Sequence, residues 1–141
     1  MIQQAEPENS IYTVGILDLA IYGSLFHPLI TTDVIITDER MNIHIRERHP
    51  GDYQRYSTLL PAMLSQPDYI LADKTPSAVI VLKHFIIEHS SIYLRLSLKI
   101  LTPQDYQKHP EHKNSILTFF HIHEREYQRL IRNKKILYKR E

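Results

Sequence analysis

The feature that most constrains this fold is an alternation of apolar and polar side chains over Ser91–Leu101. The apolar residues are Ile92, Leu94, Leu96, Leu98 and Ile100, and the polar ones between them are Tyr93, Arg95, Ser97 and Lys99. Successive side chains of a β-strand point to opposite faces, so this period of two predicts a strand with one buried face. Runs rich in Ile, Val, Leu and Tyr predict further strands at Tyr69–Ala72, Ala78–Ile87 and Ser115–Ile122. We therefore expect an antiparallel sheet in the second half.

The first half of the chain is expected to be mainly helical. After a strand at Ile11–Leu17 and a short helical stretch ending at Phe26, a helix is predicted from Thr37 or Asp38 to His49. Another follows, from Asp52 or Ser57 to about Leu64. Helices first and strands later favour an α+β fold with N-terminal helices packed on a roughly four-stranded antiparallel sheet.

The last forty residues are expected to complete this fold. The polar loop Thr102–Asn114 holds one helical turn, Glu124–Arg132 is predicted as a helix and Ile136–Tyr138 as a final strand. A chain of 141 residues is the size of one domain, so we expect a flexible N-terminus over residues 1–10 and a single domain over 11–141.

Composition excludes several classes of site and of protein. The absence of cysteine excludes disulfides, thiolate zinc sites and cysteine nucleophiles. With three glycines in total, the sequence contains no glycine-rich phosphate loop. No apolar run approaches the roughly 18 residues that a membrane-spanning helix needs. The N-terminal residues also lack the basic and apolar regions of a secretory signal, so we expect a cytoplasmic protein without membrane contact.

Charge is spread unevenly over a chain whose net charge is only +1. Residues 1–40 contain one basic and six acidic side chains, whereas residues 101–141 contain nine basic and five acidic ones. In the C-terminal segment, Arg132, Lys134 and Lys135 lie between Tyr127 and Tyr138. Basic residues contact phosphates and tyrosines stack on unpaired bases, so this end predicts an RNA-binding surface. The same pattern is also typical of a solvated terminus after a packed helix.

The segment Asp38–Pro50 has the strongest indication of chemistry. On a helix, Met41, His44, Ile45, Arg48 and His49 share one face. Arginine is rarely buried unless it is paired, so this face should line a cleft. Imidazole exchanges protons near neutral pH, which makes His44 and His49 candidate acid and base residues. Alternatively, both histidines form hydrogen bonds at an interface between helix and sheet.

Further candidates occupy the predicted strands. Lys83 interrupts an apolar run, Arg95 lies on a polar strand face, and Asn114, Ser115 and Thr118 lie near the last long strand. Nine histidines raise the question of a metal site, since His121 and His123 share a strand face and His109 and His112 flank Pro110. No triad of histidine and carboxylate with recognisable ligand spacing completes either pair, so no metal is expected.

Several blocks together resemble one family over nearly the whole chain. HIRERHP, PDYI, NSI and KKILYK follow in an order similar to that of phage-associated nuclease domains. These belong to the superfamily that unites barnase, EndoU, colicin-type tRNA nucleases and RelE toxins. The resemblance implies a metal-independent ribonuclease without cofactor, carried as a toxin or effector by a phage or prophage. It implies RNA, with tRNA as one candidate, as substrate, and a neutralising antitoxin or immunity protein as partner.

The resemblance also suggests site residues. The expected catalytic residues are His44, His49, Arg95 and Thr118. The expected RNA- or phosphate-binding residues are Arg48, Lys83, Asn114, Ser115, Arg132, Lys134 and Lys135. In this hypothesis the ribose 2′-hydroxyl attacks the phosphodiester, one histidine acts as base and cations hold the developing charge. Two alternatives are a non-catalytic phage accessory module that binds RNA or protein, and a histidine-metal hydrolase.

Overall fold

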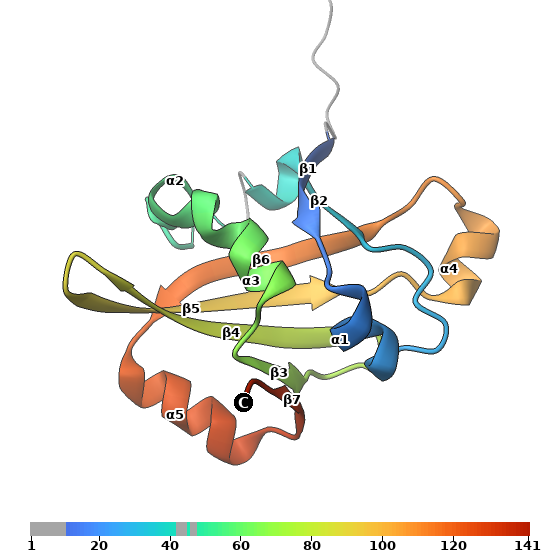
Figure 1. Cartoon of the computed structure of the whole chain (residues 1–141). Helices are drawn as coiled ribbons and strands as arrows, with labels where there is room; N and C mark the ends of the chain where they lie inside the picture. The colour runs from blue at the N-terminus through green and yellow to red at the C-terminus, as the bar shows by residue number, and fades with distance from the viewer. Residues whose placement is uncertain (1–10, 42–44, 46–47) are drawn as a thin grey trace, which may run out of the picture.

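The protein forms one mixed sheet with helices on both faces (Figure 1). The computed structural model describes residues 11–41, 45 and 48–141. Within them, seven strands form the order β1-β2-β6-β5-β4-β3-β7. The strands are β1 (Ile11–Ile16), β2 (Asp33–Thr37), β3 (Tyr69–Ala72), β4 (Ala78–Ile87), β5 (Ser90–Lys99), β6 (Asn114–Ile122) and β7 (Ile136–Lys139). The pair β2–β6 is parallel and every other neighbouring pair is antiparallel.

The α+β class is confirmed, but the expected four-stranded antiparallel sheet is wrong. The predicted strands β3 to β6 form its middle, and β1, β2 and β7 extend it at the edges. The parallel strand β2 is held beside β6 by Asn114, whose amide donates to the backbone oxygens of Thr31 and Asp33 at 2.7 and 3.0 Å. This strand pairing joins residues 80 positions apart, which local periodicity cannot predict.

Helices lie both before and after the central strands. They are α1 (Leu19–Leu25), α2 (Asp52–Tyr56), the 3₁₀ turn η2 (Ser57–Leu59), α3 (Leu60–Ser65), α4 (Pro103–Lys108) and α5 (Glu124–Asn133). Of these, α5 and α4 correspond to the predicted helix at Glu124–Arg132 and the predicted helical turn within Thr102–Asn114. Asp18 and Thr102 cap α1 and α4 by accepting hydrogen bonds from backbone N–H groups. Two predictions fall wholly or partly outside the described residues. The first is the flexible N-terminus over residues 1–10, and the second is the helix from Thr37 or Asp38 to His49, of which residues 42–44 and 46–47 are not described. No helix within the described ranges is long and apolar enough to cross a membrane.

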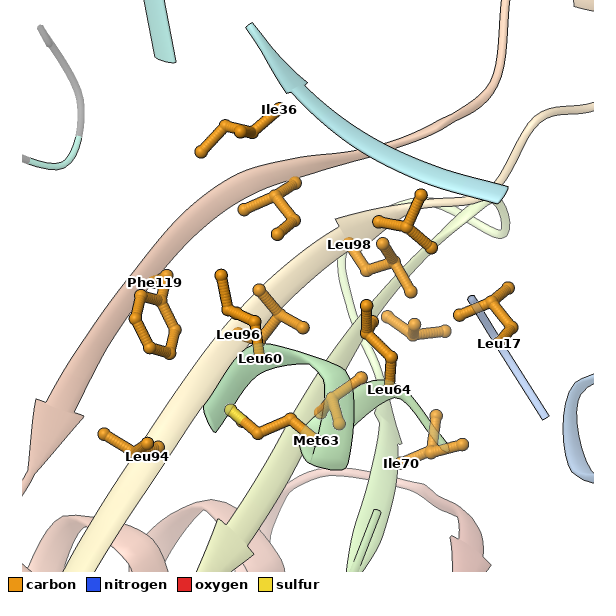
Figure 2. Close-up of a cluster of buried hydrophobic side chains, with 14 of the residues drawn as sticks. Leu17, Ile36, Leu60, Met63, Leu64, Ile70, Leu94, Leu96, Leu98 and Phe119 are labelled. Carbon is orange, nitrogen blue, oxygen red and sulfur yellow. The ribbon is translucent and has the colours of Figure 1, made fainter. Parts of the chain in front are cut away.

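The main core lies between α3 and one face of the sheet (Figure 2). Leu94, Leu96 and Leu98 of β5 are fully buried there, as their alternation predicts. They pack in one cluster with Leu60, Met63 and Leu64 of α3 and with Phe119 of β6. Each buried aliphatic side chain of this kind contributes about 1.5–3 kcal/mol to folding.

The opposite face of the sheet is covered over only part of its width. Tyr127 and Leu130 of α5 pack on Leu71, Ile80 and Leu82 of β3 and β4. The next two strands carry different side chains on this face, because Arg95 lies directly opposite Leu82 and Ser97 opposite Ile80. The result is a polar surface on β5 and β6 beside α5.

Candidate active site

A pocket of about 520 Å³ lies on this polar surface of β5 and β6. Three parts of the chain line it: both ends of the segment between β2 and α2, the turn between β3 and β4, and the strands themselves. The lining residues are Arg40, Arg48, His49, Asp73, Lys74, Thr75, Ala78, Arg95, Ser97, Leu117, Thr118 and Phe120. The sheet supplies the floor, and the two connecting segments supply the rim.

Strand register places the polar side chains of the floor together. Arg95 of β5 is opposite Phe120 of β6, and Ser97 is opposite Thr118. Residues two apart on a strand share a face, so all four face the pocket. An irregularity next to Ser97 leaves Leu117 as an extra residue on β6, and Leu117 also lines the pocket.

The ring of Phe120 joins a histidine to an arginine. The imidazole of His49 stacks on Phe120 with ring centroids 3.8 Å apart and an angle of 6° between the planes. The guanidinium carbon of Arg95 lies 5.5 Å from the centroid of the same ring, within cation–π range. The pocket therefore presents a proton-exchanging group and a cation on one rigid aromatic support.

The charges around the pocket favour an anionic ligand. Arg40, Arg48, Lys74 and Arg95 line it, against the single carboxylate of Asp73 among its lining residues. The Nε atom of Arg95 is buried and has no hydrogen-bond partner within the described part of the chain. Burial also lowers the pKa of Arg95, which reflects the incomplete solvation of its charge. The guanidinium of Arg95 lines the pocket, and its charge there favours a bound phosphate.

The environment of His49 favours its neutral form. Burial is the largest cause that lowers its pKa from the ordinary value of 6.5. The neighbouring charges of His121, Arg48 and Arg95 lower it further, and Asp52 opposes them. A neutral imidazole near neutral pH can accept a proton, which suits a general base.

Four of the expected site residues meet in this pocket. Arg48, His49, Arg95 and Thr118 all line it. His44 lies outside the described residues. Lys83, Asn114, Ser115, Arg132, Lys134 and Lys135 do not line it, although Lys135 borders a separate hollow of about 370 Å³ beyond the turn at residues 73–75.

Sequence reasoning did not single out several residues of the pocket. Ser97 and Phe120 could have been found, because each lies two residues from a predicted site residue on the same strand, Arg95 or Thr118. Arg40 and the turn residues Asp73 and Lys74 carry no such periodic signal. Only the tertiary structure places these three residues beside the pocket.

Lys83 is engaged in a buried ion pair outside the pocket. Its ammonium group donates to the backbone oxygen of Gln66 at 2.6 Å and to the Asp68 carboxylate at 3.3 Å. Arg140 near the C-terminus also pairs with Asp68, at 3.0 Å. This arrangement ties β4 to the residues before β3 and after β7, which is a structural role.

Replacing Lys83 with methionine should therefore reduce stability and leave the pocket intact. Both side chains of the Lys83–Asp68 pair are 10% exposed. Leaving a buried charge without a partner costs about 3–5 kcal/mol, but Asp68 keeps Arg140 as a partner, so we expect a loss of about 1–3 kcal/mol. Urea unfolding measures this loss, with Lys99→Met as control, because the exposed Lys99–Asp105 pair is worth less than about 1 kcal/mol. Unchanged stability with weaker RNA binding would contradict the structural role.

Asn114 is likewise a structural residue in this fold. It is fully buried, accepts a hydrogen bond from the backbone N–H of Leu101 at 2.8 Å and donates to Thr31 and Asp33. The neighbouring Ser115 pairs with Lys99 of β5 and Ile35 of β2 and is only half-buried.

We expect Asn114→Ala to lower the free energy of unfolding by about 3 kcal/mol, because one buried and two partly buried backbone groups lose their partners. Ser115→Ala is the matched control and should cost less than about 1 kcal/mol. Chemical denaturation of the three proteins makes the comparison. If Asn114→Ala is as stable as the parent but binds RNA weakly, Asn114 contacts the ligand instead.

A group of three candidate metal ligands lies on the loop after α4. Ligand atoms of His109, Glu111 and His112 lie within 4.8 Å of one another. The sequence identified the two histidines but not Glu111 as a third ligand. All three are exposed, and none lines the pocket.

Comparison with known proteins gives one match. A family model described as phage-Barnase-EndoU-ColicinE5/D-RelE like nuclease2 matches residues 17–139. This range includes every residue that lines the pocket. No curated protein and no solved structure matches the chain.

Proposed function

Because this chain belongs to the phage-Barnase-EndoU-ColicinE5/D-RelE like nuclease2 family, we propose that it is a metal-independent endoribonuclease. The observation that supports the proposal best is the cationic pocket in which Phe120 joins His49 to Arg95. RNA supplies both features that the pocket suits, a phosphodiester anion and a neighbouring 2′-hydroxyl that a base can activate.

In the proposed reaction, the 2′-oxygen attacks the adjacent phosphorus. His49 takes the proton of the 2′-hydroxyl, since its lowered pKa keeps the ring neutral near pH 7. The new bond between phosphorus and the 2′-oxygen forms as the bond to the 5′-oxygen breaks. The products are a 2′,3′-cyclic phosphate and a 5′-hydroxyl.

Other pocket residues stabilise the phosphate during this step. Arg95 lines the pocket, and its guanidinium balances the charge that builds on the phosphorane oxygens. Arg48 is exposed at the rim and contributes positive charge there. The hydroxyls of Thr118 and Ser97 lie opposite one another on the floor and position phosphate oxygens.

The proposed biological role is that of a phage or prophage toxin or effector. Such a nuclease requires control, so the proposal includes a neutralising antitoxin or immunity protein as partner and cellular RNA, with tRNA as one candidate, as target. The anionic nature of RNA suggests that this partner is acidic where it covers the pocket. The cytoplasm, where RNA is abundant, is the proposed place of action.

A cleavage assay in chelator tests the proposed activity. The protein is incubated with total RNA, with tRNA and with a short RNA, and the matched control carries one 2′-deoxyribose at the cleaved position. We expect cleavage of the RNA, 2′,3′-cyclic phosphate ends and no cleavage at the deoxy position. Cleavage of the deoxy position would contradict 2′-hydroxyl attack. Salt-dependent binding without turnover on any RNA would favour the binding module instead.

A further inference from the structure

A second histidine is held at the edge of the same strand by a buried carboxylate. Asp52, the first residue of α2, has a side chain only 6% exposed. It accepts hydrogen bonds from the backbone N–H of His121 at 3.0 Å and from the Nδ1 atom of the His121 ring at 2.9 and 3.0 Å. Both carboxylate oxygens of Asp52 therefore accept hydrogen bonds from His121 of β6.

This pairing fixes the proton on the His121 ring. An ionised carboxylate only accepts hydrogen bonds, so Nδ1 carries a proton and Nε2 is directed away from Asp52. The side chain of His121 is 46% exposed, so its ring reaches solvent, whereas the Asp52 side chain that holds it is buried. A contact with a purely structural role would not need the charged Asp52 side chain, because well-packed apolar residues stabilise a fold as well as a buried ion pair does.

The strand edge brings the two histidines near one another. β2 pairs only with Asn114 and Ser115 of β6, so the edge of β6 beyond Ser115 has no strand partner among the described residues. His49 stacks on Phe120 at one face of this edge, and His121 projects from the other. Asp52 also donates its backbone N–H to the His49 oxygen at 3.2 Å, and the charge of His121 lowers the pKa of His49.

We propose that His121 is the general acid of the cleavage reaction and that Asp52 is its positioning residue. This inference rests on the proposed ribonuclease function. In this step His121 is an imidazolium, protonated at Nδ1 toward Asp52 and also at Nε2. As His49 takes the 2′-hydroxyl proton, His121 passes its Nε2 proton to the departing 5′-oxygen and is left neutral. The phosphodiester lies at the edge of β6, between the two rings. The groups that face His121 are Asp52 and Tyr56 of α2 and the His49 ring.

The test variant is His121→Asn, because the asparagine amide preserves the hydrogen bond to Asp52 but cannot transfer a proton. His121→Gln is the second variant, used in the same way if the asparagine protein does not fold. His123→Asn is the matched control, since His123 is exposed two residues further along. Circular dichroism and thermal unfolding establish that each protein is folded.

Each protein is assayed on two RNAs, one ordinary and one with sulfur in place of the bridging 5′-oxygen at the cleaved bond. A thiol has a pKa near 8.5, so a thiolate leaves without a general acid. We expect His121→Asn to cleave ordinary RNA about 10²-fold more slowly than the parent and to regain the parental rate on the sulfur substrate. Asp52→Asn should show the same rescue, and His123→Asn should match the parent on both.

Three results would overturn the proposal in distinguishable ways. If a folded His121→Asn protein cleaves ordinary RNA as fast as the parent, His121 has no catalytic role. If it is slow on both substrates, its defect is not loss of the acid. If the parent cleaves neither substrate, the ribonuclease function itself fails, and the acid role fails with it.

Discussion

A His49→Phe protein is expected to fold normally and to cleave RNA about 10³-fold more slowly than the parent. Phenylalanine keeps the ring that stacks on Phe120, where the centroids are 3.8 Å apart, but removes both ring nitrogens. The loss would then come from the missing base and not from a collapsed pocket. His109→Phe is the matched control, because His109 is exposed on a remote loop and does not line the pocket.

The pH dependence of the parent gives an independent readout of His49. A general base acts when deprotonated, so kcat/KM should fall as the pH drops through the pKa of His49. Burial and the surrounding cations lower that pKa, so the midpoint of the acid limb should lie below 6.5. In His49→Phe this limb should disappear. Full activity in His49→Phe, or an unchanged acid limb, would assign the base to another group.

Arg95→Met is expected to slow cleavage by about 10²–10³-fold, because the phosphorane loses its main cationic hydrogen-bond donor. Methionine has a similar length and can still pack on Phe120, so the fold should remain. Stability should not fall, since the Arg95 charge is incompletely solvated and its Nε has no partner within the described residues. Single-turnover rates on a short RNA measure the effect.

The control for Arg95 is Arg125→Met on α5. Arg125 is exposed and does not line the pocket, so its loss should leave the rate unchanged. Arg95→Lys should fall between the parent and Arg95→Met, because lysine retains the charge but not the planar donor set. If Arg95→Met cleaves as fast as the parent, other cations hold the phosphate.

Local patterns predicted the central strands well, because alternation is a property of a few neighbouring residues. The buried positions Leu94, Leu96 and Leu98 follow directly from it. The same alternation placed Arg95 on the polar face that forms the pocket floor. The parallel pairing of β2 with β6 was not predicted, because it depends on Asn114. The hydrogen-bond partners of Asn114, Thr31 and Asp33, lie far from it in the sequence.

The candidate site was predictable only where a residue type was itself unusual. His49 and Arg48 stood out on a helical stripe, and both line the pocket. Lys83 stood out because it interrupts an apolar run, but its buried pair with Asp68 gives it a structural role. His121 was considered only as a metal ligand beside His123, because the sequence gives no sign that Asp52, 69 residues earlier, would bind its ring.

The long separation between the two halves of the pocket has a consequence during synthesis. The nascent chain presents His49 and Asp52 well before Phe120 and His121 have been added. At 5–20 residues per second, the separation of 69 residues between Asp52 and His121 takes roughly 3–14 s to translate. Until β6 has left the ribosome, His49 has no aromatic support and the pocket has no floor. Assembly of the site is thus delayed to a late stage of translation, and under the proposed ribonuclease function this delay would protect the RNA of the ribosome that makes the chain.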